Sequence, residues 1–327
     1  MSNDLAIVVL AAGKGTRMGS DTAKVLARVY GKSLIEHVLT TCLTLKPCQI
    51  TVVTGYQREI VESHITAWWE SHGSGETQLC FALQEQQLGT GHAAKSALPT
   101  LENFTGNILI TYGDIPLVKA DTFQACIKHH QTHHATVSLI SIKGEYDNWY
   151  GRVVRSHDNQ VLKIVERKDC SSAELLLDET NSGIYVVDSS FLKPALDKLQ
   201  NNNVQKEYYL TDIVEHAASE GQTVEAMVCF DADELRGVNT KQELQKIERK
   251  LMDERIAGLA AGDVYFSDPQ SCFIDSEVSI GANTQIGPQV VLLGETSIGS
   301  EVVIEGCAYV KDSSILDKSN IRWGVRI

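Results

Sequence analysis

The sequence predicts an α/β protein, with a Rossmann-like, mostly parallel sheet followed by a short left-handed parallel β-helix. Three features carry this prediction. Strand-like and helix-like stretches alternate in the first half, a helical spacing follows Thr240, and aliphatic residues then recur every six positions. We therefore expect three parts: an α/β domain at 1–239, a connecting helix at 240–262 and a hexapeptide-repeat β-helix at 263–327.

The alternation in the first half is typical of strands joined by crossover helices, which produce a mostly parallel sheet with helices on both faces. In such sheets ligands bind beyond the carboxyl ends of the strands. The glycine loop near Gly13 and the "TYGD" ending at Asp114 both follow expected strands and would open onto that edge. The alternating stretches are 5–10, 34–45, 50–54, 60–69, 79–83, 108–112, 122–134 and 136–142.

The C-terminal region shows a period of six residues, and glycine directly follows several of the aliphatic positions. An ordinary β-sandwich would alternate every second residue, so the period favours a β-helix with about three hexapeptides per coil. We expect fewer than three coils and a last coil covered by self-association, as in the trimers common among hexapeptide proteins. The periodic residues are Ile274, Ile280, Ile286, Leu292, Ile298, Ile304, Val310 and Leu316.

Composition narrows the classes of partner. Nucleic-acid binding needs a positively charged surface for the phosphate backbone. The net charge of -13 does not supply one, so we expect no nucleic-acid partner. We expect no membrane partner and a cytoplasmic location. No apolar run is long enough to span a bilayer, and the N-terminus lacks the succession of basic, apolar and small residues that forms a signal peptide. The eight cysteines are scattered singly, which predicts reduced, structural thiols.

The stretch "LAAGKGTRM", residues 10–18, follows the first expected strand. It lacks the third glycine of a dinucleotide fingerprint, and within it no Lys is followed by the Ser or Thr of a P-loop. What remains is a loop of small residues whose backbone N–H groups can approach an anion, with Lys14, Arg17 and Lys24 nearby. The alternative is a tight turn with solvated basic side chains.

Further motifs follow in order along the chain: "AKVL", "QEQQLGTGHA", "YGDIPL", "YGR", "IVERKD", "NSGIY", "EYYLTDI" and "GVN". Together with the glycine loop and the hexapeptide tail, they resemble the sugar-1-phosphate nucleotidyltransferases. Within that family they resemble the bacterial uridyltransferases that act on N-acetylglucosamine 1-phosphate. The resemblance covers nearly the whole chain and implies a nucleotidyltransferase (pyrophosphorylase) domain at 1–239.

The resemblance implies transfer of a uridylyl group from UTP to N-acetylglucosamine 1-phosphate, releasing pyrophosphate. Because the attacking phosphate oxygen is already an anion, catalysis reduces to positioning and charge neutralisation. Arg17 and Lys24 resemble the family's catalytic cations, and Asp114 and Asn239 its ligands for Mg²⁺, a metal that prefers hard oxygen ligands. Taken alone, Asp114 also fits an ordinary turn and Asn239 a helix N-cap.

The resemblance also implies which residues hold the two substrates. For two of these positions an alternative interpretation exists: Glu166 also fits a surface residue in a salt bridge, and the Gly-Thr-Gly that starts at Gly89 also fits a simple helix cap. The residues implied for the nucleotide are Leu10, Ala11, Ala12, Gly13, Lys24, Gln84, Gly89 and Thr90. Those implied for the sugar are Tyr112, Gly151, Glu166 and Asn181.

Two departures from the family matter. Ala23 stands where the family usually has proline, which predicts a less rigid Lys24 loop. The long hexapeptide array that carries an acetyltransferase site is missing, so we expect no acetyltransferase activity. The rival hypotheses are a UDP-glucose or other nucleotide-sugar pyrophosphorylase, a non-catalytic regulatory subunit of the same architecture, and a pure hexapeptide acyltransferase.

The segment "KHHQTHH", residues 128–134, pairs His129 with His133 and His130 with His134 on an expected helix. This spacing can bind a transition metal. No carboxylate motif accompanies the histidines in the sequence, so we interpret the segment as a solvated helix face.

Overall fold

The computed structural model describes residues 5–15, 22–144 and 150–327, and the chain forms two compact units. The first unit contains residues up to Ala27 and from Ser33 to Asn239. The second contains Thr240 to Ile327 together with Arg28–Lys32. The short segment Arg28–Lys32 thus joins the second unit, whereas the boundaries expected from the sequence put it in the first.

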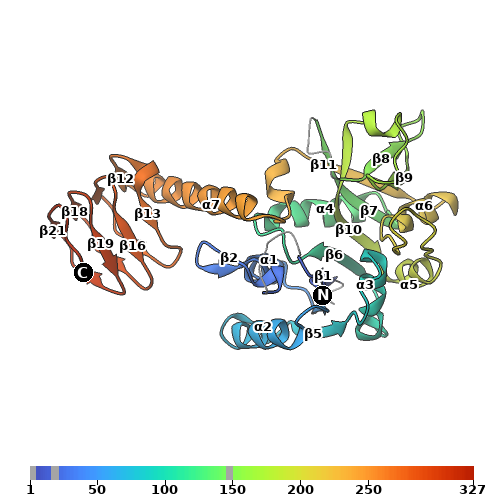
Figure 1. Ribbon diagram of the computed structural model, residues 1–327, viewed down its shortest axis with the longest axis horizontal. Coiled ribbons are helices and arrows are strands. Elements are labelled where there is room, and N and C mark those ends of the chain that lie inside the picture. The colour runs from blue at the N-terminus through green and yellow to red at the C-terminus, as the bar shows by residue number, and fades with distance from the viewer. Residues whose placement is uncertain (1–4, 16–21, 145–149) are drawn as a thin grey trace. The chain divides into compact units, whose positions relative to one another are not determined.

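The first unit is built on a nine-stranded sheet with the order β11-β7-β10-β6-β1-β4-β5, and β8 and β9 extend it beside β10 (Figure 1). The pairs among β6, β1, β4 and β5 are parallel, as is β11 with β7, whereas β10 runs antiparallel to β6 and β7. The mostly parallel sheet is therefore confirmed. Its strands are β1 (Leu5–Leu10), β4 (Gln49–Thr54), β5 (Gln78–Leu83), β6 (Asn107–Tyr112), β7 (Val137–Lys143), β8 (Arg152–Arg155), β9 (Val161–Val165), β10 (Glu179–Asp188) and β11 (Val224–Cys229).

Both faces of this sheet are buried, which explains the unbroken apolar run of β1. Ala6, Val8 and Leu10 join one core cluster with residues of α3, α5 and α6, and Ile7 and Val9 join the opposite cluster with residues of α1, α2 and α4. Successive side chains of β1 thus pack into two separate hydrophobic clusters, one on each face of the sheet. The helices are α1 (Leu34–Thr44), α2 (Arg58–His72), α3 (Thr90–Ser96), α4 (Ala120–Thr132), α5 (Ser189–Asp197) and α6 (Asp212–Ser219).

The second unit begins with α7 (Lys241–Ala261), which has the expected helical spacing. Thr240 is its N-cap and forms a capping box with Glu243, so the expectation that Asn239 caps this helix is wrong. The hairpin of β2 (Arg28–Val29) and β3 (Lys32–Ser33) brings Tyr30 to this unit. The Tyr30 hydroxyl donates a hydrogen bond to the backbone oxygen of Ile274.

The C-terminal strands form three parallel sheets, β12-β15-β18-β21, β13-β16-β19 and β14-β17-β20, which confirms the hexapeptide β-helix. Strands β12 to β20 make three complete coils and β21 starts another, so the expectation of fewer than three coils is wrong. The strands are β12 (Tyr265–Phe266), β13 (Phe273–Ile274), β14 (Ser279–Ile280), β15 (Gln285–Ile286), β16 (Val291–Leu293), β17 (Ser297–Ile298), β18 (Val303–Ile304), β19 (Tyr309–Lys311), β20 (Ser314–Ile315) and β21 (Asn320–Ile321).

The prediction that Leu316 is the last inward-facing residue of the six-residue repeat is wrong. Ile274 pairs with Leu292, 18 positions later, but Ile298 pairs with Ile315, only 17 positions later. The third coil is one residue shorter, so Ile315 takes the place expected for Leu316. Leu316 is accordingly 78% exposed, whereas Val310 is fully buried.

Among the described residues, none of the helices combines the length and the apolar character that a membrane span requires.

Candidate active site

A cleft of about 340 Å³ opens at the carboxyl ends of β1 and β6, where the sequence predicted a ligand site. It collects side chains from segments far apart in the chain, all within the first unit. The expected residues that line it are Leu10, Ala11, Ala12, Gly13, Lys24, Gln84, Gly89, Thr90, Tyr112, Asp114 and Asn239. Arg17 lies outside the described residues.

The glycine loop is held by its neighbours in the sheet. The Ala11 N–H donates to the Val53 oxygen at 2.9 Å, and the Ala12 oxygen accepts from the Tyr56 N–H at 3.2 Å. Gly15 has a φ of +63°, and a Cβ there would lie 2.4 Å from the Lys24 Cβ. Only glycine therefore lets the loop come this close to Lys24.

Lys24 lies between the two residues expected to hold a metal. Its ammonium forms an ion pair with Asp114 and donates a hydrogen bond to Asn239 Oδ1 at 2.8 Å. The Lys24 and Asp114 side chains are only 13% and 20% exposed. The Val238 N–H donates to the Asp114 backbone oxygen at 2.9 Å, which holds the neighbouring Asn239 against Asp114.

The donor atoms of Asp114 and Asn239 are of the kind that binds a divalent metal. A carboxylate and an amide oxygen converge on a position that already attracts a positive charge, the Lys24 ammonium. Hard oxygen donors of this kind suit Mg²⁺, which takes one or two protein ligands and completes its shell with phosphates and water.

Gln84 and the turn before α3 form another wall of the cleft. Gln84 is almost fully buried, and its Nε2 donates to the Gly89 oxygen at 3.0 Å. Gly89 has a φ of 107°, and a Cβ there would lie 2.5 Å from the Tyr208 backbone oxygen. Glycine thus permits the close approach of the 207–209 segment, which brings Glu207 into the cleft lining.

The expected sugar residues Gly151, Glu166 and Asn181 form a neighbouring group outside the cleft lining. The Asn181 N–H donates to the Gly151 oxygen at 2.9 Å, and the Asn181 Oδ1 accepts from the Gly183 N–H at 3.1 Å. Gly183 packs closely against the ring of Tyr112, because a Cβ there would lie 2.5 Å from the ring atom Cε2. Tyr112 therefore stands between the two groups.

Two groups near this boundary have shifted pKa values. Burial raises the pKa of Glu166, although the Thr211 hydroxyl, which donates to Glu166 Oε1 at 3.2 Å, acts in the opposite direction. Burial, followed by the negative charges of Glu166 and Asp114, raises the pKa of Tyr112 well above its usual value. Tyr112 is thus a neutral hydroxyl at physiological pH, able to donate a hydrogen bond.

The turn 55–57 was missed by the sequence reasoning. Tyr56 binds Ala12 through its backbone, and the Lys14 ammonium lies 5.3 Å from the centre of the Tyr56 ring. The Gln57 side chain accepts a hydrogen bond from the Ala23 N–H at 2.7 Å. The turn therefore contacts both the glycine loop and the Lys24 loop. Its position after the strand β4 was the one available signal.

The comparisons with known proteins agree with this geometry. Residues 6–235 match the family model described as nucleotidyl transferase, and residues 277–312 match the bacterial transferase hexapeptide (six repeats). The chain is 38% identical over 322 residues to the Bifunctional protein GlmU of Geotalea uraniireducens, covering 98% of this chain and 69% of that protein. It is 40% identical over 321 residues to the Bifunctional protein GlmU of an Exiguobacterium species, covering 97% and 68%.

A further relative, the Bifunctional protein GlmU of Exiguobacterium sibiricum, is 38% identical over 318 residues, covering 97% of this chain and 69% of that protein. The nucleotidyl transferase model spans well over half of the chain, and these relatives align with nearly all of it. The chain therefore belongs to the nucleotidyl transferase family and, within it, to the GlmU proteins.

Proposed function

We propose that this nucleotidyltransferase transfers the uridylyl group of UTP to N-acetyl-α-D-glucosamine 1-phosphate, giving UDP-N-acetylglucosamine and pyrophosphate. The observation that carries the proposal is the position of Lys24, whose ammonium is bonded to both Asp114 and Asn239 in a cleft walled by the glycine loop. A cleft with these groups meets the needs of phosphoryl transfer, which are positioning and charge neutralisation.

The reaction joins the sugar phosphate to the α-phosphorus of UTP. An oxygen of the sugar phosphate attacks that phosphorus, a new P–O bond forms, and the bond to the β-phosphate breaks with its electron pair leaving on pyrophosphate. The attacking oxygen is already an anion, so no side chain has to remove a proton. The small residues at Ala11, Ala12 and Gly13 let backbone N–H groups approach the triphosphate. The ammonium of Lys24 stabilises the negative charge that develops on the transferred phosphate.

Asp114 and Asn239 are the residues that would hold Mg²⁺ here. The ion would neutralise the charge of the triphosphate and of the departing pyrophosphate. Arg17, by its place in the glycine loop, is proposed as a second cation on the triphosphate.

Recognition of the base is proposed for Gln84, Gly89 and Thr90. A buried carboxamide and the backbone groups of a tight turn supply donors and acceptors that suit the edge of uracil. Recognition of the sugar is proposed for Tyr112, Gly151, Glu166 and Asn181. Hydroxyl, carboxylate and amide groups are suitable partners for the sugar hydroxyls and the acetamido group.

Assembly is proposed to run through the β-helix. Hexapeptide proteins pack their coils against copies of themselves, and we propose a homotrimer in the cytoplasm. Sedimentation of the full chain beside a variant ending at Gly262 tests this assembly. The variant should sediment as a smaller species, and an unchanged oligomer size would refute a role for the β-helix. We also expect the 327-residue chain by itself not to consume acetyl-CoA, which a thiol-release assay would check.

The experiment for the reaction compares acceptors. Purified chain, UTP and Mg²⁺ are incubated with N-acetylglucosamine 1-phosphate or with glucose 1-phosphate, and the nucleotide sugar is identified by mass spectrometry. UDP-N-acetylglucosamine as the preferred product supports the proposal. UDP-glucose as the preferred product moves the function to the UDP-glucose pyrophosphorylases, and no product with any sugar phosphate favours the non-catalytic subunit.

A further inference from the structure

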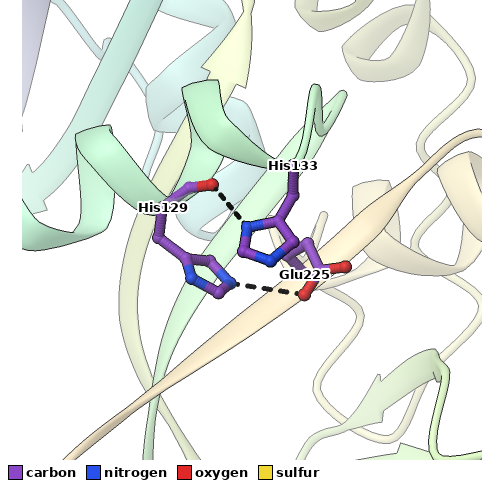
Figure 2. A group of neighbouring side chains, drawn as sticks. All are labelled: His129, His133 and Glu225. Carbon is purple, nitrogen blue, oxygen red and sulfur yellow. Dashed lines mark hydrogen bonds and ion pairs between the residues drawn. The ribbon is translucent and has the colours of Figure 1, made fainter.

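A group of three metal-binding side chains lies outside the cleft, where the C-terminal end of α4 meets β11 (Figure 2). His129 lies in the last turn of α4, His133 is the C-cap residue of that helix, and Glu225 lies in β11. The three offer ligand atoms that all lie within 4.8 Å of one another. None of them lines the cleft described above.

The orientation of the His133 ring suits a metal. His133 Nδ1 lies 2.9 Å from the backbone oxygen of His129, and a carbonyl only accepts, so Nδ1 carries the hydrogen. In the neutral ring the lone pair is therefore on Nε2. A hydrogen bond from the second ring nitrogen to a backbone carbonyl is the usual way in which proteins orient a metal-bound imidazole.

Glu225 adds a carboxylate oxygen to the two imidazole nitrogens as a third possible ligand. His129 Nε2 lies 3.3 Å from Glu225 Oε2, and the two imidazole rings have centres 4.1 Å apart. Ligands at tetrahedral positions around zinc lie about 3.4 Å from one another, given metal–ligand distances of about 2.0–2.1 Å. His133 is exposed, and the His129 and Glu225 side chains are partly exposed, so dense core packing does not lock their rotamers.

The neighbouring histidines do not belong to this group. His130 is buried, with Nδ1 2.9 Å from Ser138 Oγ and Nε2 3.3 Å from Asp188 Oδ1, so both ring nitrogens have partners. The interpretation of residues 128–134 as a solvated face is therefore wrong for His130. His134 is exposed and lies outside the three-residue group, which makes it a matched control.

We propose that His129, His133 and Glu225 form a binding site for one divalent transition-metal ion, with zinc the best match for two imidazoles and a carboxylate. Three protein ligands leave a fourth position for water. The bound ion would connect the end of α4 to β11, a strand at the edge of the sheet, and would stabilise the folded chain in proportion to its occupancy.

Zinc titration of the full chain tests the site. After treatment with EDTA and transfer into excess Mg²⁺, which occupies hard oxygen sites, the chain is titrated with Zn²⁺ in a calorimeter. We expect one equivalent to bind, and we expect His133→Ala and Glu225→Gln each to weaken that binding at least 10-fold, whereas His134→Ala leaves it unchanged. Zn²⁺ should also raise the Tm of the wild-type chain and of the His134 variant, but not that of the other two.

The free cysteines are the competing ligands, and Co²⁺ separates them from the proposed site. Cobalt bound by imidazole and carboxylate gives visible ligand-field bands without the intense near-ultraviolet band of a cobalt–thiolate bond. No stoichiometric binding, a thiolate band, or equal affinity in the wild type and in both ligand variants would overturn the proposal.

Discussion

Lys24 donates a hydrogen bond to Asn239 over 2.8 Å, although the two residues are 215 positions apart in the chain. The same ammonium is paired with Asp114, so one cation joins the loop after β1 to the ends of two later segments. Lys24 and Asp114 stabilise each other, because a partly buried charge without a partner is costly, and Asn239 adds a hydrogen bond to the ammonium.

Replacing Lys24 by methionine keeps the aliphatic stem and removes the charge. We expect kcat to fall by about 10²- to 10³-fold, because the cation that we propose for the transferred phosphate is lost. Lys128→Met, on the exposed surface of α4, is the matched control and should leave kcat within experimental error. A Lys24→Met enzyme with wild-type kcat would remove Lys24 from the mechanism.

Asp114→Asn should abolish turnover at ordinary Mg²⁺ concentrations while leaving the circular dichroism spectrum unchanged. The amide keeps the shape of the side chain but loses the negative charge that the metal requires. Activity should return in part at high Mg²⁺ if the defect is in metal affinity. Wild-type activity in this variant would contradict the metal assignment.

The contact between Ala23 and Gln57 predicts a coupling that a double-mutant cycle can measure. Gln57 has a φ of 53°, so Gln57→Asn keeps a residue that tolerates this conformation and shortens the side chain beyond reach of the Ala23 N–H. Loss of the hydrogen bond costs about 1 kcal/mol, roughly fivefold in kcat/KM if the loop position limits catalysis.

Ala23→Pro supplies the second arm of the cycle. Proline fits the φ of -52° at this position but has no N–H to donate. In the proline background, Gln57→Asn should therefore have no further effect on kcat/KM. An equal effect of Gln57→Asn in both backgrounds would show that Gln57 does not act through Ala23.

Gln84→Glu tests the proposed role of Gln84 in base recognition with little change in side-chain volume. The substitution replaces the Nε2 donor that binds the Gly89 oxygen by a carboxylate oxygen, so two acceptors would face each other. We expect kcat/KM for UTP to fall at least 10-fold and the preference for UTP over other nucleoside triphosphates to weaken. Unaltered nucleotide selectivity would remove Gln84 from base recognition.

Asp212 predicts a pH dependence of stability. Burial, followed by the charges of Glu215 and Asp169, raises its pKa from 3.8 to about 6. The folded chain then binds this proton more tightly than the unfolded chain, so the free energy of unfolding falls as the pH rises from about 4 to about 6. Asp212→Asn removes this contribution and should stabilise the chain at pH 7 by about 1 to 3 kcal/mol.

Urea unfolding of the wild type and Asp212→Asn across this pH range checks the prediction. The difference in the free energy of unfolding between the two proteins should grow as the pH rises to about 6 and then stay level. A difference that is constant with pH would show that Asp212 titrates normally in the folded chain.

The sequence predicted most of what periodicity and local motifs encode. The alternation of strands and helices, the hexapeptide coils and the meeting of the glycine loop with Asp114 at one edge of the sheet all follow from patterns visible along the chain, whereas Gln84 was implied only by the family resemblance. The glycine loop and Asp114 could be placed together without knowledge of long-range contacts, because parallel strands bring their carboxyl ends to one edge.

What the sequence could not predict depends on contacts between distant segments. Glu225 joins His129 across 96 positions, and nothing in the local motif "KHHQTHH" shows that carboxylate. Likewise, the one-residue shortening that exposes Leu316 is decided by the pairing of β17 with β20, because Ile315 and Leu316 are both aliphatic. Gln57 was missed for the same reason, since its role comes from the distant Ala23.

The most direct test of the central claim follows the phosphorus atoms of UTP. UTP labelled in the α-phosphate is incubated with N-acetylglucosamine 1-phosphate, Mg²⁺ and either the wild type or Asp114→Asn, and pyrophosphate and labelled sugar nucleotide are quantified together. We expect the wild type to form the two products in equal amounts, neither product to form without the sugar phosphate or with EDTA, and Asp114→Asn to form almost none. Pyrophosphate release that needs no sugar phosphate, or full activity of Asp114→Asn, would contradict it.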